Sequence, residues 1–156
     1  IRGVVPTTLM APRSGRPLDP YDAAVRLLAQ RPHSAAELRR KLRARGCAPE
    51  AVEGALERVR GLGYQDDASF ARSLVAYRSS HRGRSAIAAE LARRGVGREE
   101  VAAALTDLGS DDELRAARRL AARLGPVEPR RLAGRLERRG FSTAVIRAVV
   151  ELDPLD

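Results

Sequence analysis

Two histidines, one cysteine and a pair of aspartates are the residues whose types could support catalysis or metal binding. His33 and His81 stand in short polar stretches without a partner histidine at helical spacing, whereas a metal site needs three or four converging ligands, so we expect solvated loop histidines. Cys47 is the only cysteine, and a small buried apolar role suits it better than a nucleophile. The adjacent Asp66 and Asp67 suit helix capping, because neighbouring side chains on one backbone do not face a common centre. The sequence therefore predicts a protein that is not an enzyme and carries no metal or cofactor.

Basic residues are the other group with chemical meaning, because guanidinium groups bind phosphates and carboxylates. The chain has 29 basic and 20 acidic residues, a net charge of +9, and every basic residue except Lys41 is arginine. They cluster in three related phrases, KLRARG, ELARRG and RLERRG. The candidate contacts in and beside these phrases are Arg39, Arg40, Lys41, Arg43, Arg45, Arg93, Arg94, Arg130, Arg131, Arg135, Arg138 and Arg139. A solvated face with salt bridges explains any one of them, but their repetition predicts one continuous basic stripe for a phosphate backbone or an acidic protein groove.

The three phrases end at Gly46, Gly95 and Gly140, and aligning the chain on these glycines reveals a repeat with spacings of 49 and 45 residues. Apolar residues recur eight and four positions before each glycine and six and ten positions after it. The columns are Leu38, Ile87 and Leu132; Leu42, Leu91 and Leu136; Val52, Val101 and Ile146; and Leu56, Leu105 and Val150. This register predicts a helix, a stop at the glycine, and a second helix packed against the first.

A further helix precedes each pair, so the sequence predicts an all-α fold of three tandem three-helix repeats in an elongated, curved array. Asp19-Pro20 and the capping-box pattern Ser34 to Glu37 mark helix starts, and the middle repeat should contain helices over 67–78 and 84–94. The expected organisation is a flexible proline-containing N-terminal arm over residues 1–18 and repeats over 19–62, 63–109 and 110–156.

Composition limits the function classes further. Aromatic residues make up 3% of the chain and tryptophan is absent, which argues against an aromatic stacking platform for RNA. The single cysteine fits a reducing cytoplasm, and no apolar run approaches the roughly 20 residues that span a membrane. The middle repeat, with seven basic and six acidic residues, is the least charged, so it should space two basic neighbours.

The middle repeat resembles the RecX family, the bacterial regulators of the RecA recombinase. The matching residues in the middle repeat are Gly63, Tyr64, Asp66, Asp67, Phe70, Ala71, Gly83, Ile87, Glu90, Leu91, Gly95 and Val96. The resemblance continues in the first repeat through Ala24, Leu27, Leu28, Arg31, Ser34, Glu37, Leu38, Lys41, Leu42 and Gly46. It covers about residues 20–152, although the third repeat matches loosely.

The resemblance implies tandem three-helix repeats and a non-enzymatic regulator, expected as a monomer. Such a protein would bind along the groove of the RecA filament on single-stranded DNA and inhibit ATP hydrolysis, strand exchange and the co-protease activity that triggers the SOS response. Direct contact with single- or double-stranded DNA is also implied. A general nucleic-acid-binding protein remains the alternative, and a scaffold for an unrelated partner is a third. Sequence-specific reading of DNA is disfavoured because the third helices, PEAVEGALERV and REEVAAALTDL, are acidic or alanine-rich.

Overall fold

The computed structural model describes residues 17–151, and within them the chain forms nine helices and no strand. The helices are α1 (Pro20–Gln30), α2 (Ala35–Ala44), α3 (Pro49–Gly61), α4 (Asp67–Arg78), α5 (Arg84–Arg93), α6 (Arg98–Thr106), α7 (Ser110–Leu124), α8 (Pro129–Arg138) and α9 (Thr143–Glu151). The predicted all-α fold is confirmed. Most of the expected N-terminal arm lies outside the described residues.

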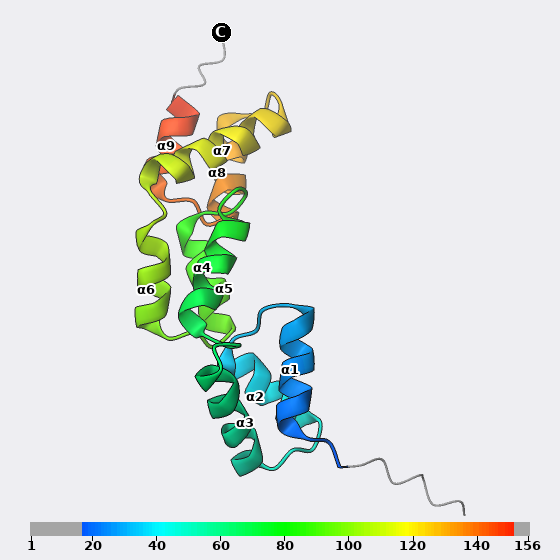
Figure 1. Ribbon diagram of the computed structural model, residues 1–156. Coiled ribbons are helices and arrows are strands. Elements are labelled where there is room, and N and C mark those ends of the chain that lie inside the picture. Colours follow the sequence, from blue (N-terminus) through cyan, green and yellow to red (C-terminus); the bar gives the residue numbers. More distant parts are fainter. Residues whose placement is uncertain (1–16, 152–156) are drawn as a thin grey trace, which may run out of the picture.

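Three modules of three helices follow one another along an elongated array (Figure 1). Each module has its own hydrophobic core: the first draws on residues 23–59, the second on residues 70–108 and the third on residues 116–149. Within residues 17–151, no core cluster mixes buried residues from two modules. Hydrophobic burial therefore stabilises each module separately, and polar contacts and close backbone packing must join the modules.

The apolar residues that precede the repeat glycines face these cores. The buried side chains in these columns are Leu38, Leu42, Ile87, Leu91, Leu132 and Leu136. In the columns that follow the glycines, Val101, Ile146 and Val150 are partly buried and pack against the core clusters of their modules. The register deduced from the sequence thus identifies the inward face of the helices.

The predicted helix starts carry their expected hydrogen bonds. The Asp19 carboxylate accepts from the Tyr21 backbone N–H at 3.0 Å. Ser34 and Glu37 form a complete capping box: Ser34 Oγ accepts from the Glu37 N–H at 3.1 Å, and the Glu37 carboxylate accepts from the Ser34 N–H at 3.2 Å. These bonds satisfy backbone donors that the first helical turn leaves without partners.

No helix between residues 17 and 151 combines the length and the apolar character required to cross a lipid bilayer.

Candidate binding surface

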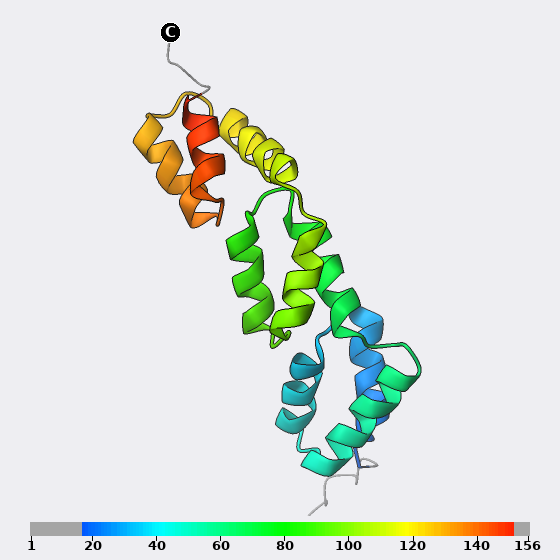
Figure 2. The same cartoon turned by 90° about the vertical axis from the view of Figure 1, so that its left-hand side faces the viewer.

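The second helices of the modules, α2, α5 and α8, lie end to end in a row along one edge of the array (Figure 2). Ser34 Oγ, at the start of α2, donates to the carbonyl oxygen of Arg94 at the end of α5, with 2.5 Å between the oxygens. At the next junction the Gly83 N–H donates to the Arg139 carbonyl at 2.8 Å, and Ser85 Oγ donates to the Gly140 carbonyl at 2.8 Å. The start of α2 thus donates to a carbonyl at the end of α5, and the start of α5 donates to carbonyls at the end of α8. A helix end leaves such carbonyls without partners.

The repeat glycines allow this close approach. Gly95 and Gly140 have φ angles of +78° and +83°, which non-glycine residues rarely adopt. A Cβ atom at Gly95 would lie 2.3 Å from the Ala36 Cβ, and one at Gly140 would lie 2.4 Å from the backbone nitrogen of Ala86. Gly46 has the same backbone conformation, with φ +89°, but no atom of residues 17–151 lies within 4 Å of a Cβ built there. The glycine therefore ends a helix in all three modules and also forms a junction in two.

The α2 helix contributes the first part of the basic surface. Arg40, Arg43 and Arg45 are exposed. Arg39 is held against α3, because its Nε lies 2.5 Å from Glu53 Oε1. Lys41 Nζ lies 3.0 Å from His33 Nε2, so the Lys41 ammonium already has one hydrogen-bond partner within the module. Of the five candidates on α2 and at its C-cap, three therefore present guanidinium groups without a protein partner among the described residues.

The α5 helix contributes less than expected. Arg93 is exposed, but Arg94 lies between the first two modules, where its guanidinium contacts the Glu37 carboxylate at 2.9 Å and the Glu90 carboxylate at 3.0 Å. Its assignment to the exposed stripe is corrected: Arg94 is a junction residue. Arg84 also points away from the row, since its Nη1 donates to the Leu105 carbonyl at 2.9 Å.

The junction around Arg94 is an ion network. Two buried carboxylates, of Glu37 and Glu90, receive four guanidinium groups, of Arg31, Arg78, Arg82 and Arg94. Burial by itself would raise the pKa of both carboxyl groups. The hydrogen bonds and charges of these arginines outweigh that effect, and the pKa of both groups is lowered. Both carboxylates are therefore ionised near neutral pH, and the network keeps a surplus of two positive charges.

The α8 helix restores the positive charge at the other end of the row. Its exposed arginines are Arg130, Arg131, Arg135 and Arg138, with Arg139 as the exposed C-cap. The row therefore has two basic ends separated by α5, which exposes Arg93 alone among the candidates. At about 1.5 Å per residue, the three ten-residue helices span roughly 45 Å of helix axis.

Sequence reasoning missed a second set of exposed arginines. Arg118, Arg119 and Arg123 are exposed on α7, the helix that buries Ala116 and Ala117 in the third core. Their helical spacing in DELRAARRLAAR was a usable signal. They lie outside the three repeated phrases, so the repeat did not identify them as candidate contacts.

The burial of His33 and that of Cys47 both differ from the sequence-based expectation. His33 is buried, at 2% exposure, which contradicts the expected solvated position. Its Nδ1 lies 2.8 Å from the Arg31 carbonyl and its Nε2 faces Lys41, an arrangement that suits a neutral ring donating from Nδ1. Cys47 is half-buried and packs against the first core, so it is less enclosed than expected. No group of three potential metal ligands occurs within residues 17–151.

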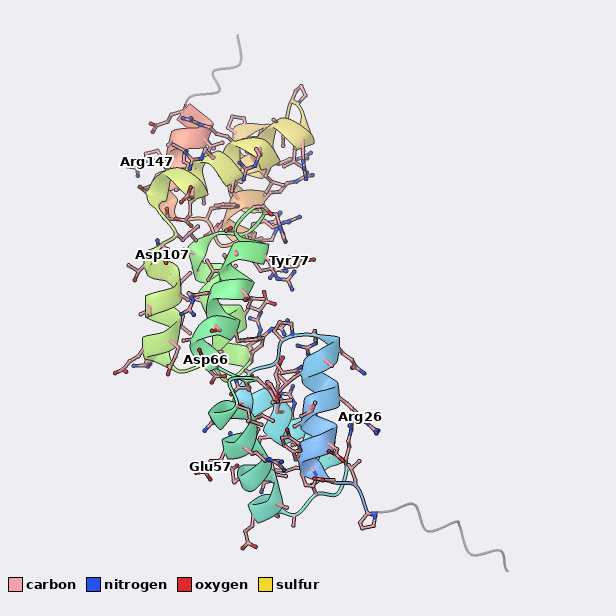
Figure 3. All side chains as sticks on the ribbon, viewed as in Figure 1. Arg26, Glu57, Asp66, Tyr77, Asp107 and Arg147 are labelled. Atoms are coloured by element: carbon pink, nitrogen blue, oxygen red, sulfur yellow. The ribbon has the colours of Figure 1, made fainter. Side chains whose placement is uncertain are left out.

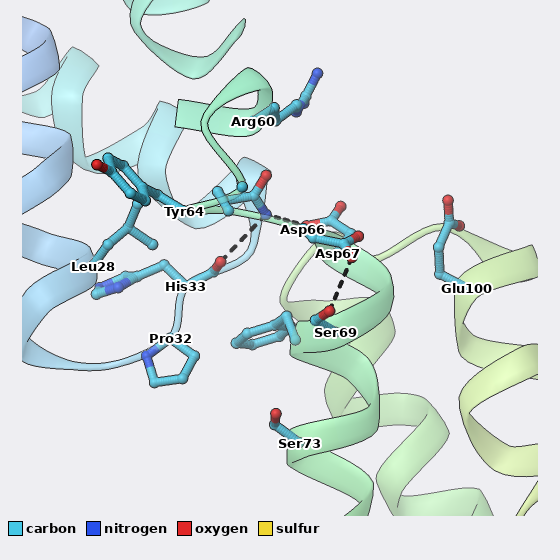
Figure 4. A pocket seen from close by; sticks show the side chains of 13 residues that line it. Leu28, Pro32, His33, Arg60, Tyr64, Asp66, Asp67, Ser69, Ser73 and Glu100 are labelled. Atoms are coloured by element: carbon cyan, nitrogen blue, oxygen red, sulfur yellow. Dashed lines mark hydrogen bonds between the residues drawn. The ribbon is translucent and has the colours of Figure 1, made fainter. Parts of the chain in front are cut away.

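The aspartate pair caps two different helices. Asp66 accepts from the Ala68 N–H at 3.0 Å and caps α4, as the sequence predicts. Asp67 reaches the preceding module instead, where its carboxylate accepts from the Ala35 N–H at 2.9 Å, at the start of α2. Asp67 also accepts from Gln65 Nε2 at 2.8 Å (Figure 4). Asp67 thus contributes to the first junction, whereas Asp66 caps its own helix.

Joined helical modules with polar junctions define the class, a tandem three-helix-repeat protein. The chain belongs to the RecX family. A model of the first three-helix domain of RecX matches residues 21–58, and a model of the second matches residues 66–105. The family resemblance seen in the sequence is confirmed.

Curated relatives agree with this membership, and a solved structure shares the fold. A regulatory protein RecX of Xanthomonas campestris pv. campestris (strain B100) is 41% identical over 153 residues, which cover 92% of this chain and 94% of the relative. One of Stenotrophomonas maltophilia (strain R551-3) is 38% identical over 151 residues, or 92% and 93% of the two chains. The crystal structure of RecX from Lactobacillus salivarius is similar in fold, with a TM-score of 0.76 at 19% identity, over 85% of this chain and 93% of that one.

Proposed function

We propose that this chain is a negative regulator of RecA that binds along the filament of RecA on single-stranded DNA. Bound there, it inhibits ATP hydrolysis, strand exchange and the co-protease activity that triggers the SOS response. Membership of a family of regulatory proteins supports a regulatory role. The single structural observation that carries the proposal is the row of α2, α5 and α8, whose two ends are basic.

An extended partner suits this row better than a small ligand. Binding energy from exposed guanidinium groups is distributed along the edge and falls as salt concentration rises. A protein of this shape can contact several repeating units of a filament at once, and simultaneous contacts raise the total affinity. We further propose that the protein acts as a cytoplasmic monomer and that the arginines contact acidic or phosphate groups of the filament.

The test compares two variants that lose the same charge. The first replaces Arg40 and Arg43 of α2 and its C-cap residue Arg45 by alanine. RecA ATPase activity on single-stranded DNA is titrated with wild type and variant over a range of salt concentrations. We expect the concentration for half-inhibition to rise about tenfold or more, with a weaker salt dependence, because three anion contacts are lost.

The matched control replaces the exposed α7 residues Arg118, Arg119 and Arg123 by alanine, and we expect inhibition within about threefold of wild type. Equal losses in both triple variants would mean that net charge matters and the row does not. A wild-type protein that leaves the ATPase unchanged would refute the regulatory proposal. Binding to bare DNA is measured beside it, because inhibition only at concentrations that saturate bare DNA would favour the alternative of a general nucleic-acid-binding protein.

A further inference from the structure

A groove crosses the junction between the first two modules, on a surface that the basic row does not use. It consists of two adjoining cavities of about 840 Å³ and about 490 Å³. Pro32, Phe70 and Ser73 line both cavities, so the two adjoin along α4. Figure 4 shows the larger cavity between the loop that carries Pro32 and the helix that carries Ser69 and Ser73.

Aromatic side chains concentrate in this groove. The chain contains five aromatic residues, and three of them, Tyr64, Phe70 and Tyr77, line the two cavities. Tyr64 is 56% exposed in the larger cavity and Tyr77 is 68% exposed in the smaller one. In Figure 3 Tyr77 projects from α4 into solvent. Exposed tyrosines beside an apolar floor are typical anchor points of protein interfaces, because a ring buries a large area at a small entropic cost.

The two ends of the groove differ in charge. The larger cavity is lined by the carboxylates of Asp66, Asp67 and Glu100 against the single guanidinium of Arg60. Among the described residues, the smaller cavity is lined by three arginines and by no acidic residue; the arginines are Arg31, Arg78 and Arg94. They are members of the junction network, in which four guanidinium groups share two carboxylates, so positive charge remains for a ligand. The groove is therefore acidic at one end, basic at the other and apolar between.

This polarity distinguishes between classes of partner. A nucleic-acid strand carries negative charge along its whole length, and the acidic end would repel it. A protein segment can match both ends and place an apolar side chain over Phe70. We propose that the groove docks a segment of the protein component of the filament, with a carboxylate at the Arg78 end, a lysine or arginine at the Glu100 end and an apolar anchor between them. This inference rests on the proposed function, since it names the surface through which that function recognises protein.

The experiment measures the affinity of the full chain for preformed RecA filaments on single-stranded DNA and, separately, for bare single-stranded DNA. The variant Tyr64→Ser with Tyr77→Ser removes both anchors. We expect its filament affinity to fall about tenfold or more, because aromatic anchors dominate the energetics of such interfaces. Leu18→Ser is the control, since Leu18 is 46% exposed and does not line the groove, and its affinity should stay within about twofold of wild type.

Glu100→Arg adds a test by sign. If the groove receives a basic group at its acidic end, this substitution should lower filament affinity several-fold. If the groove receives a phosphate chain, the same substitution should raise filament affinity. Far-UV circular dichroism checks that the variants are folded. If the double tyrosine variant keeps filament affinity within twofold of wild type, the proposed docking groove is refuted but the proposed function is not. A parallel fall in affinity for bare DNA overturns the docking groove in favour of base stacking. A wild type that binds no filament refutes the proposed function as well.

Discussion

Replacing Gly95 by alanine tests whether the repeat glycine joins modules as well as ending a helix. The substitution has two costs. An L-residue in the left-handed conformation of Gly95, at φ +78°, costs about 1–2 kcal/mol. The new Cβ would also lie 2.3 Å from the Ala36 Cβ, so α2 and α5 must move apart, and such overpacking typically costs about 1–3 kcal/mol more. The free energy of unfolding should therefore fall by about 2–5 kcal/mol.

Gly46→Ala separates the two costs. Gly46 has φ +89°, yet a Cβ there meets no atom of the described residues within 4 Å. It should lose only the conformational cost of about 1–2 kcal/mol. The double variant Gly95→Ala with Ala36→Gly removes the overlap, so it should recover most of the excess loss, less about 0.5–1 kcal/mol for a glycine within a helix. The recovery measures the coupling between the two positions.

Urea unfolding followed by far-UV circular dichroism supplies these free energies, and hydrogen exchange assigns each loss to a module, because tandem arrays need not unfold in one step. Equal losses for Gly95→Ala and Gly46→Ala would refute the junction role, since the two positions share their backbone conformation and differ only in the neighbouring module. Failure of Ala36→Gly to rescue Gly95→Ala would show that the strain lies elsewhere.

Two further predictions concern the core and the buried histidine. Leu91→Ala should lower the stability of the second module by about 2–5 kcal/mol, because Leu91 is fully buried; a much smaller loss in urea unfolding would show that this face is not the core. Burial lowers the pKa of His33 below its usual 6.5. The hydrogen bond to the Arg31 carbonyl opposes this shift, and the charges of Arg31 and Lys41 add to it. The contribution of His33 to stability is therefore complete above pH 6.5 and is lost as the pH falls below that value. Wild type should lose more stability than His33→Gln between pH 7.5 and pH 5.5, and equal losses would contradict the buried neutral ring.

Much of this architecture could be read from local pattern. Leu42, Leu91 and Leu136 stand at one register position because a helix buries residues three and four apart, and each is buried in the structure. The capping box at Ser34 involves residues three apart, so the sequence contains the whole interaction. Helix bounds and the repeat followed from such signals.

Contacts between modules could not be read in this way. Arg93 and Arg94 are neighbours in one basic phrase, yet only the second lies in the junction, between Glu37 and Glu90. His33 is polar and precedes a helix, as an exposed loop residue would, but the Arg31 carbonyl and Lys41 enclose it. These outcomes depend on which helix ends meet, and no local period encodes that.

The sequence by itself therefore determined the helices, their inward faces, the threefold repeat and the excess of positive charge, because each depends on residues close together in the chain. The tertiary structure alone decided which arginines remain free, which glycines join modules and where a groove of mixed charge opens. Ser34 and Arg94 are 60 residues apart in the sequence, and Ser85 and Gly140 are 55 residues apart. Only the stacking of modules brings such residues into contact.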